Sequence, residues 1–91
     1  MIVRRHFLVR GRVQGVGFRY FTEMAAMRER LSGWVRNTHD GDVEIEVEGE
    51  AEAVDRFERA INRGPSGARV DAVETTEDAP TGRVTGFMVR G

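Results

Sequence analysis

Ninety-one residues suffice for one domain with one core, so we expect residues 1–91 to form a single domain. No apolar run is long enough to cross a bilayer, which favours a cytoplasmic protein. The chain has no cysteine, which excludes disulfides, and His6 and His39 lie too far apart for a local metal motif. All fourteen basic residues are arginine, so the lysine of a Walker-type phosphate loop is missing. Residues 1–39 hold eight arginines and two acids, a net charge of +6, whereas residues 40–91 hold six arginines and thirteen acids, a net charge of −7. The basic first half suits a small anionic ligand, but the chain lacks the charge of a nucleic-acid-binding protein.

The first element predicted is a strand at residues 6–13, "HFLVRGRV", in which apolar and polar residues alternate. A helix follows at residues 20–31, "YFTEMAAMRERL", and Ser32-Gly33 ends it. We expect the methionines and aromatic residues of this helix to pack in the core rather than to form a binding surface.

Between these two elements lies a glycine-rich loop in the stretch "GRVQGVGFRYF", residues 11–21. Glycines let backbone N–H groups approach a ligand, a helix start points further N–H groups the same way, and Arg19 adds a planar set of donors. The loop therefore suggests a cradle for a small anion. A plain strand-to-helix turn with a solvated arginine explains the same residues equally well.

Residues 33–49 predict a β-hairpin around His39, Asp40 and Gly41. A three-residue loop with Gly41 in the left-handed region places Arg36 opposite Glu44, which polarity favours over the two-residue alternative. This register divides the side chains between two faces. The inner face receives Val35, Asn37, Val43, Ile45 and Val47, and the outer face receives Trp34, Arg36, Glu44, Glu46 and Glu48.

An amphipathic helix at residues 50–63 follows, with Glu52/Arg56 and Asp55/Arg59 as expected ion pairs and Gly64-Pro65 as its end. A strand at residues 68–77 and a short strand within residues 83–91 complete the chain. This order predicts an α+β, ferredoxin-like split βαβ sandwich: βαββαβ plus a short final strand, an antiparallel sheet and two helices on one face. The other face of the sheet should be open to water.

Because this architecture serves many functions, the site must decide among them. An RNA-recognition motif needs aromatic residues on the exposed face of its third strand, but "DVEIEVE" presents acids there, which we expect to pair with Arg10, Arg12 and Arg36. No carboxylate pair or nucleophilic triad is apparent. In a split βαβ unit the loop after Val13 and the end of the strand at Asn37 share one edge of the sheet, so Arg19 and Asn37 can meet. A buried asparagine satisfied by local backbone is the alternative for Asn37.

Two motifs of this sequence closely resemble the acylphosphatase family: "VRGRVQGVGFR", residues 9–19, and "GWVRN" followed by "DGDVEIEVEG", residues 33–37 and 40–49. The element order extends the resemblance over essentially the whole chain. The resemblance implies hydrolysis of an acyl phosphate to a carboxylate and inorganic phosphate without metal or cofactor. The implied partner is a small-molecule acyl phosphate, with no nucleic acid and no membrane, and the implied state is a monomer.

Carried over residue by residue, the resemblance makes Arg19 the phosphate-binding arginine and Asn37 the residue that orients the attacking water. The backbone N–H groups of Gly15, Val16, Gly17, Phe18 and Arg19 are expected to hold the phosphate oxygens. A similar domain occurs in a large hydrogenase-maturation carbamoyltransferase, but the length of this chain favours the free enzyme. The remaining alternative is a ferredoxin-like module that binds phosphate or another anion without catalysis.

Overall fold

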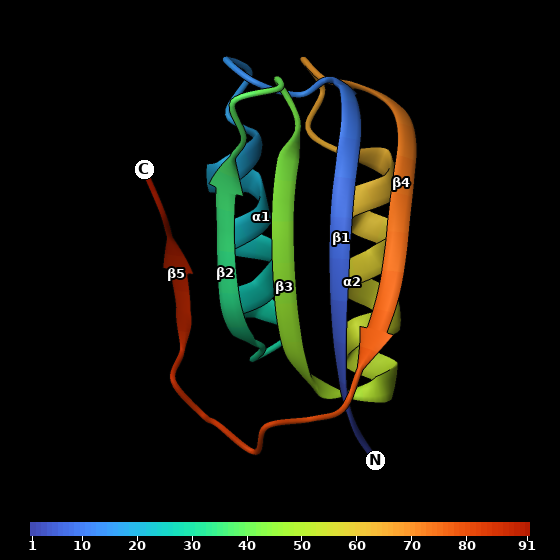
Figure 1. Cartoon of the computed structure of the whole chain (residues 1–91), viewed down its shortest axis with the longest axis vertical. Helices are drawn as coiled ribbons and strands as arrows, with labels where there is room; N and C mark the ends of the chain where they lie inside the picture. The colour runs from blue at the N-terminus through green and yellow to red at the C-terminus, as the bar shows by residue number, and fades with distance from the viewer.

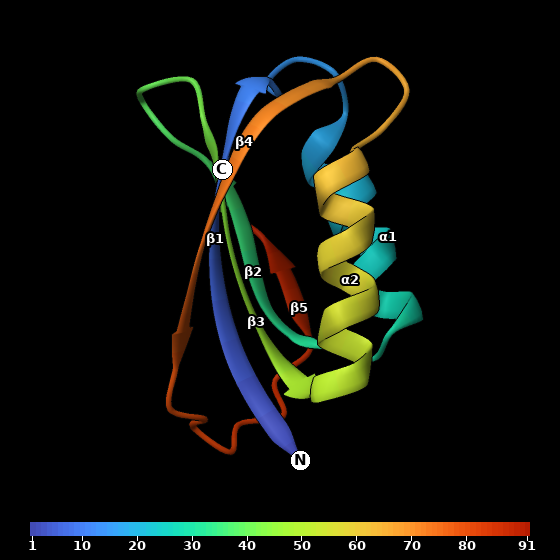
Figure 2. The same cartoon turned by 90° about the vertical axis from the view of Figure 1, so that its right-hand side faces the viewer.

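The computed structural model describes all 91 residues of the chain. Its elements are β1 (Ile2–Arg12), α1 (Phe18–Arg28), β2 (Ser32–Asn37), β3 (Val43–Glu50), α2 (Ala51–Arg63), β4 (Arg69–Asp78) and β5 (Phe87–Val89). The strands form one sheet in the order β4-β1-β3-β2-β5, and both helices cover the same face of it (Figures 1 and 2). The α+β, ferredoxin-like order predicted from the sequence is confirmed. Neither helix has the length and apolar character needed to span a membrane.

The first four strands pair in antiparallel fashion, as predicted. Arg36 lies opposite Glu44, and the Thr38 N–H donates to the Asp42 carbonyl at 2.9 Å, which confirms the three-residue hairpin loop. The last strand differs, because β5 pairs with β2 in parallel and makes the sheet mixed. Its direction follows from the path of the chain: β4 runs opposite to β1 and β2, and the chain reverses again before β5.

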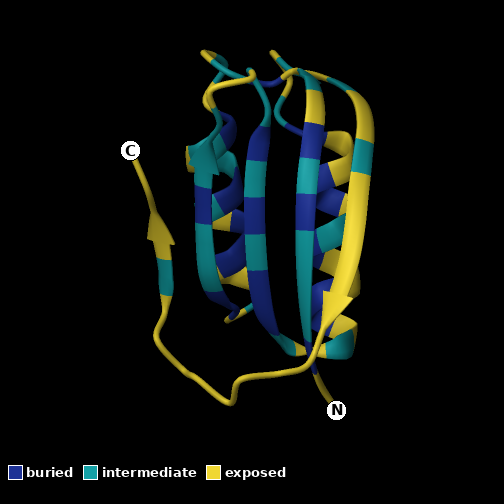
Figure 3. Cartoon of the chain, in the orientation of Figure 1, coloured by how far each residue is buried: buried dark blue, intermediate teal, exposed yellow.

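A core of 17 buried apolar residues fills the space between the sheet and the helices. The predicted alternation places Phe7, Val9 and Val13 in it, at most 1% exposed, and Phe57 of α2 packs against Phe7 with ring centroids 5.9 Å apart. The predicted inner-face valines and isoleucine of the hairpin are fully buried as well. Figure 3 shows these buried positions alternating along β1 and β3.

Helix α1 differs in part from the prediction. It begins at Phe18, two residues earlier than expected, and Phe18, Thr22, Ala25 and Ala26 face the core. Phe21 packs against the core as predicted, but Tyr20, Met24 and Met27 are exposed, at 67%, 43% and 59%, so the prediction is wrong for these three. The reason is that the large Phe18 ring occupies the core at the start of the helix and small residues follow it on the same face.

The predicted charge pairing on the outer face is only partly correct. Arg36 does bind Glu44, which also bonds to the His6 ring at 2.7 Å. Burial acts to raise the pKa of Glu44, but the hydrogen bonds of His6 and Arg36 outweigh it and leave that pKa below its ordinary value. Arg10 pairs with Asp42 and Glu74, whereas Arg12 forms no ion pair.

The two ion pairs expected within α2 do not form. Asp55 binds Arg5 of β1 at 2.7 Å, and Arg56 binds Glu29 at 2.9 Å. Arg5 lies on β1 and Glu29 directly after α1, so these charges of α2 connect the helix to its neighbours instead of stabilising it internally. The sequence pattern of i,i+4 pairs contains no information about such long-range partners.

The segment after β4 passes around the lower end of the sheet in Figure 1 and then rises along β2 as β5. We call residues 79–91 the C-terminal arm. Glu48 anchors it: its carboxylate accepts hydrogen bonds from Thr81 N–H, Thr81 hydroxyl and Gly82 N–H at 2.7–3.0 Å. Glu48 is only 8% exposed, so the prediction of a fully open outer face is wrong at this end.

Candidate active site

The loop between β1 and α1 has the backbone conformation of an anion cradle. Gly15 and Gly17 have φ values of 75° and 78°, a region that a side chain disfavours. None of the backbone hydrogen bonds outside the helices and strands uses the N–H groups of Gly15, Val16 or Gly17. The first hydrogen bond of the helix is Phe21 N–H to Gly17 carbonyl at 3.0 Å, so the N–H groups of its first turn also have no intrahelical acceptor.

Arg19 is the second residue of α1 and is partly exposed. Its guanidinium donates to the backbone carbonyl of Arg90 at 2.9 Å, and it forms no ion pair. A carbonyl oxygen holds the side chain but does not neutralise it, so the positive charge of Arg19 remains available at the loop. The contact with the C-terminal arm has no counterpart in the local sequence, and the prediction therefore missed it.

Asn37 ends β2 on the inner face and is partly exposed. None of the side-chain hydrogen bonds in the protein involves its amide, in contrast to Gln14. The Gln14 amide donates to the carbonyls of Thr38 and Asp42, both at 2.8 Å. These two bonds attach the glycine loop to the hairpin next to Asn37. Sequence reasoning missed this positioning role of Gln14, although a polar residue between glycines was a visible signal.

Arg19, Asn37 and the glycine loop line a single open cavity of about 570 Å³. Gly15, Gly17 and Phe18, which the sequence predicted for phosphate binding, line this cavity together with Val13, which it did not. The structure adds residues that the sequence did not indicate: Tyr20 and Glu23 from α1, and Val89, Arg90 and Gly91 from the arm. Val16, predicted to bind phosphate through its N–H, does not line the cavity but lies between two glycines that do. The structure thus brings the two predicted side chains to one site.

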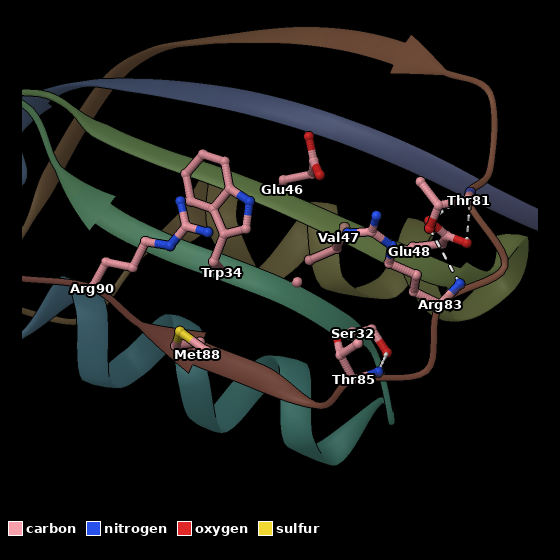
Figure 4. Close-up of a pocket in the computed structure, with 11 residues that line it drawn as sticks. Ser32, Trp34, Glu46, Val47, Glu48, Thr81, Arg83, Thr85, Met88 and Arg90 are labelled. Atoms are coloured by element: carbon pink, nitrogen blue, oxygen red, sulfur yellow. Dashed lines mark hydrogen bonds between the residues drawn. The ribbon is translucent and has the colours of Figure 1, made fainter.

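A second, smaller hollow of about 200 Å³ lies on the outer face of the sheet (Figure 4). Trp34 and Met88 contribute its apolar surface, and Arg90 lies over the Trp34 ring, 4.6 Å from its centroid. It contains no residue of the glycine loop and neither Arg19 nor Asn37. The larger cavity is therefore the candidate active site. No cluster of three or more His, Cys, Asp or Glu side chains suited to a metal ion is present in the chain.

Comparison with known proteins agrees with this geometry. The acylphosphatase family model matches residues 5–89. The chain belongs to the acylphosphatase family. An acylphosphatase from Pseudomonas aeruginosa is 51% identical over 85 residues, which cover 93% of this chain and 92% of that protein. As a member of the acylphosphatase family, the chain is an acyl phosphate hydrolase.

Solved structures place the chain among acylphosphatases as well. The crystal structure of the acylphosphatase from Bacillus subtilis has a TM-score of 0.94 at 38% identity, with all of both chains covered. Full-length HypF, in a phosphate- and nucleotide-bound form, has a TM-score of 0.90 at 35% identity, but the match spans only 12% of its chain. The similarity to the bacterial acylphosphatase extends from end to end.

Proposed function

We propose that Arg19 and the backbone N–H groups of Gly15 to Arg19 bind the phosphate of an acyl phosphate, and that Asn37 orients the water that attacks it. The products are a carboxylate and inorganic phosphate. Phosphate is already a good electrophile once its charge is screened, and the carboxylate is a good leaving group. Positioning and electrostatic stabilisation are therefore sufficient for catalysis.

The charge distribution at the cavity supports this division of roles. Arg19 is bound to a neutral carbonyl, so its full charge can act on a phosphate, and its planar donors suit two phosphate oxygens at once. The unpaired N–H groups of the loop supply further donors without a mobile side chain. The hydrogen bonds from both sets of donors become stronger as negative charge accumulates on the phosphate oxygens in the transition state.

Asn37 lies on a different element from the phosphate-binding groups, which suits a residue that acts on the water. Its amide is not used within the protein, so both its oxygen and its nitrogen can bind a ligand. An amide holds a water molecule in place but cannot remove its proton. In this mechanism the proton passes to an oxygen of the substrate's own phosphate, and no protein base is needed.

One observation carries the proposal: two predicted side chains from separate elements, and a loop with unpaired N–H groups, line the same cavity. A non-catalytic anion-binding module needs the loop and Arg19 but gives no role to an unengaged Asn37 amide. All of these groups come from one chain, which supports action as a monomer. Tyr20, Glu23 and Val89, which also line the cavity, have no role in this phosphate chemistry and remain for the acyl group.

The test is phosphate release from benzoyl phosphate and from p-nitrophenyl phosphate, each with and without a chelator. We expect turnover of the acyl phosphate alone, unaffected by the chelator. Preference for the monoester or loss of activity on chelation would contradict the proposal. Phosphate binding without turnover of either substrate would favour the anion-binding module.

A further inference from the structure

The smaller hollow on the outer face, which we call the Trp34 hollow, is lined by two carboxylates and two arginines (Figure 4). Only the carboxylates have side-chain hydrogen-bond partners within the protein. The two carboxylates are already used within the protein. Glu46 binds Arg4 at 3.3 Å, and Glu48 accepts its hydrogen bonds from Thr81 and Gly82. Both carboxylates are therefore held by other parts of the chain.

The two arginines of the hollow are not used in this way. The guanidinium groups of Arg83 and Arg90 form no ion pair and donate no hydrogen bond; Arg90 only stacks on Trp34. In Figure 4 Arg90 lies against the indole ring, and Arg83 reaches in from the other end of the hollow. The groups free to bind a ligand here are therefore two guanidinium groups, whereas both carboxylates of the hollow already have partners in the protein.

Both arginines extend from a segment that is fixed to the sheet. The arm is bound through Glu48 at its start and by Thr85 N–H to the Ser32 hydroxyl at 3.2 Å. Further along, Gly33 N–H donates to Gly86 carbonyl at 3.0 Å and Arg90 N–H to Val35 carbonyl at 2.8 Å. Because these hydrogen bonds already order the backbone of the arm, binding does not have to order it.

We propose that the Trp34 hollow binds a small organic anion, with a phosphate or carboxylate head between Arg83 and Arg90 and a planar, apolar body against Trp34 and Met88. Guanidinium groups suit the planar recognition of both heads, and an indole ring suits a flat apolar group. A volume of about 200 Å³ admits one head group and one ring. The hollow shares one lining residue, Arg90, with the candidate active site, but the proposal does not depend on the proposed function.

Trp34 is the only tryptophan of the chain, so its fluorescence reports on this hollow. The probe is phenyl phosphate, titrated into the full chain, with benzoate as the carboxylate probe and benzyl alcohol as the uncharged control. We expect a saturable change with both anions, because the ligand draws Arg90 away from the ring, and no change with benzyl alcohol. Silencing the catalytic cavity with Arg19→Ala should leave this response intact.

The variants separate this site from general charge effects. Arg83→Gln should raise the dissociation constant at least threefold and leave acyl phosphate turnover unchanged, which also shows that the variant is folded. Arg69→Gln is the matched control, because it removes an equal charge from an exposed arginine elsewhere, and it should change nothing. Three results would overturn the proposal: a response lost in Arg19→Ala, equal affinities in Arg83→Gln and Arg69→Gln, or a response that rises linearly without saturation.

Discussion

Arg19 differs from most other arginines of the first half of the chain in what it contacts. Arg4, Arg5, Arg10 and Arg36 each bind at least one carboxylate, whereas Arg19 binds only the Arg90 carbonyl. A counter-ion would compete with phosphate for the guanidinium; a backbone carbonyl orients the side chain without that competition. The geometry at this residue therefore favours binding of an external anion.

Replacing Arg19 tests that assignment. Arg19→Ala removes a charge-assisted contact worth about 1.5–3 kcal/mol, so the inhibition constant of inorganic phosphate should rise about tenfold or more. Arg19→Lys should restore only part of the affinity, because a point charge lacks the planar pair of donors. The measurement is competitive inhibition of acyl phosphate hydrolysis by phosphate. An unchanged inhibition constant in Arg19→Ala would place the anion elsewhere.

Asn37 should show the opposite pattern. If its amide acts on the water, its contribution is felt mainly in the transition state, and Asn37→Ala should lower kcat by about 10²–10³ while phosphate inhibition stays near that of the parent. The structure shows no hydrogen bond of its side chain to the protein, so we expect the free energy of unfolding to change by less than about 1 kcal/mol.

The two readouts are taken on the same Asn37→Ala preparation, with a urea titration for stability. The alternative drawn from the sequence, a polar side chain that satisfies local backbone, requires a loss of about 1–3 kcal/mol with activity lost only through unfolding. A folded variant with parental kcat would remove Asn37 from the mechanism.

At the level of elements, the sequence predicted the features that depend on neighbouring residues in the chain. The hairpin register follows from alternation over a short loop, and it placed Asn37 and the glycine loop at one edge of the sheet correctly. For α1 the prediction was correct for Phe21 but wrong for Tyr20, Met24 and Met27, and Phe18, which begins the helix and packs in the core, had been assigned to the loop. The route of the C-terminal arm could not be predicted, because Glu48 and Thr81 are far apart in sequence and neither has a distinctive pattern.

Glu48 is the residue on which the position of the arm depends, and its environment makes the effect depend on pH. The backbone hydrogen bond of Thr81, which outweighs burial, lowers the pKa of Glu48 from its ordinary value of 4.5. A carboxyl group with a lowered pKa in the folded state stabilises the fold above its unfolded pKa, and this contribution is lost as the pH falls through the folded value. The arm should therefore loosen below about pH 4.5.

Glu48→Gln tests the anchoring role of the carboxylate, because glutamine has nearly the same shape without the charge. The amide nitrogen cannot accept the N–H and hydroxyl bonds, so we expect a loss of about 1.5–3 kcal/mol at pH 7 that shrinks as the pH falls below 4.5. Glu46→Gln is the control, since its ion pair with Arg4 is worth about 0–1 kcal/mol. Stability comes from urea titrations at several pH values. Equal losses in both variants, or a loss for Glu48→Gln that does not vary with pH, would contradict the anchoring role.

Over the whole molecule, the basic first half and the acidic second half of the sequence interleave. Arginines of β1 meet acids of β3, β4 and α2, so the charge division seen in the sequence is largely cancelled in space. Arg19, Arg83 and Arg90 are among the arginines that form no ion pair, and they line the two sites where ligands are proposed to bind. The sequence therefore indicated an anionic ligand correctly in sign, but only the folded structure separates free arginines from paired ones.

Arg5 joins the two layers of the molecule. Its guanidinium binds Glu77 of β4 at 2.8 Å and Asp55 and Glu58 of α2 at 2.7 and 3.1 Å, and its side chain is only 16% exposed. The hydrogen bond to Glu77, followed by that to Asp55, raises the pKa of Arg5 further above its ordinary value. Without this cation, three carboxylates from two layers are left close together.

We therefore expect Arg5→Gln to lower the free energy of unfolding by about 1–3 kcal/mol, which lowers the Tm of a chain of this size by roughly 4–8 °C for each kcal/mol. The matched control is Arg56→Gln, which removes the same charge from a single, half-exposed pair with Glu29 and should cost about 0–1 kcal/mol. Urea and thermal unfolding of both variants measure the difference. If Arg5 holds the helix layer to the sheet, Arg5→Gln must lose more stability than Arg56→Gln. Equal losses in the two variants would show that apolar packing, such as Phe7 against Phe57, attaches α2 to the sheet without help from Arg5.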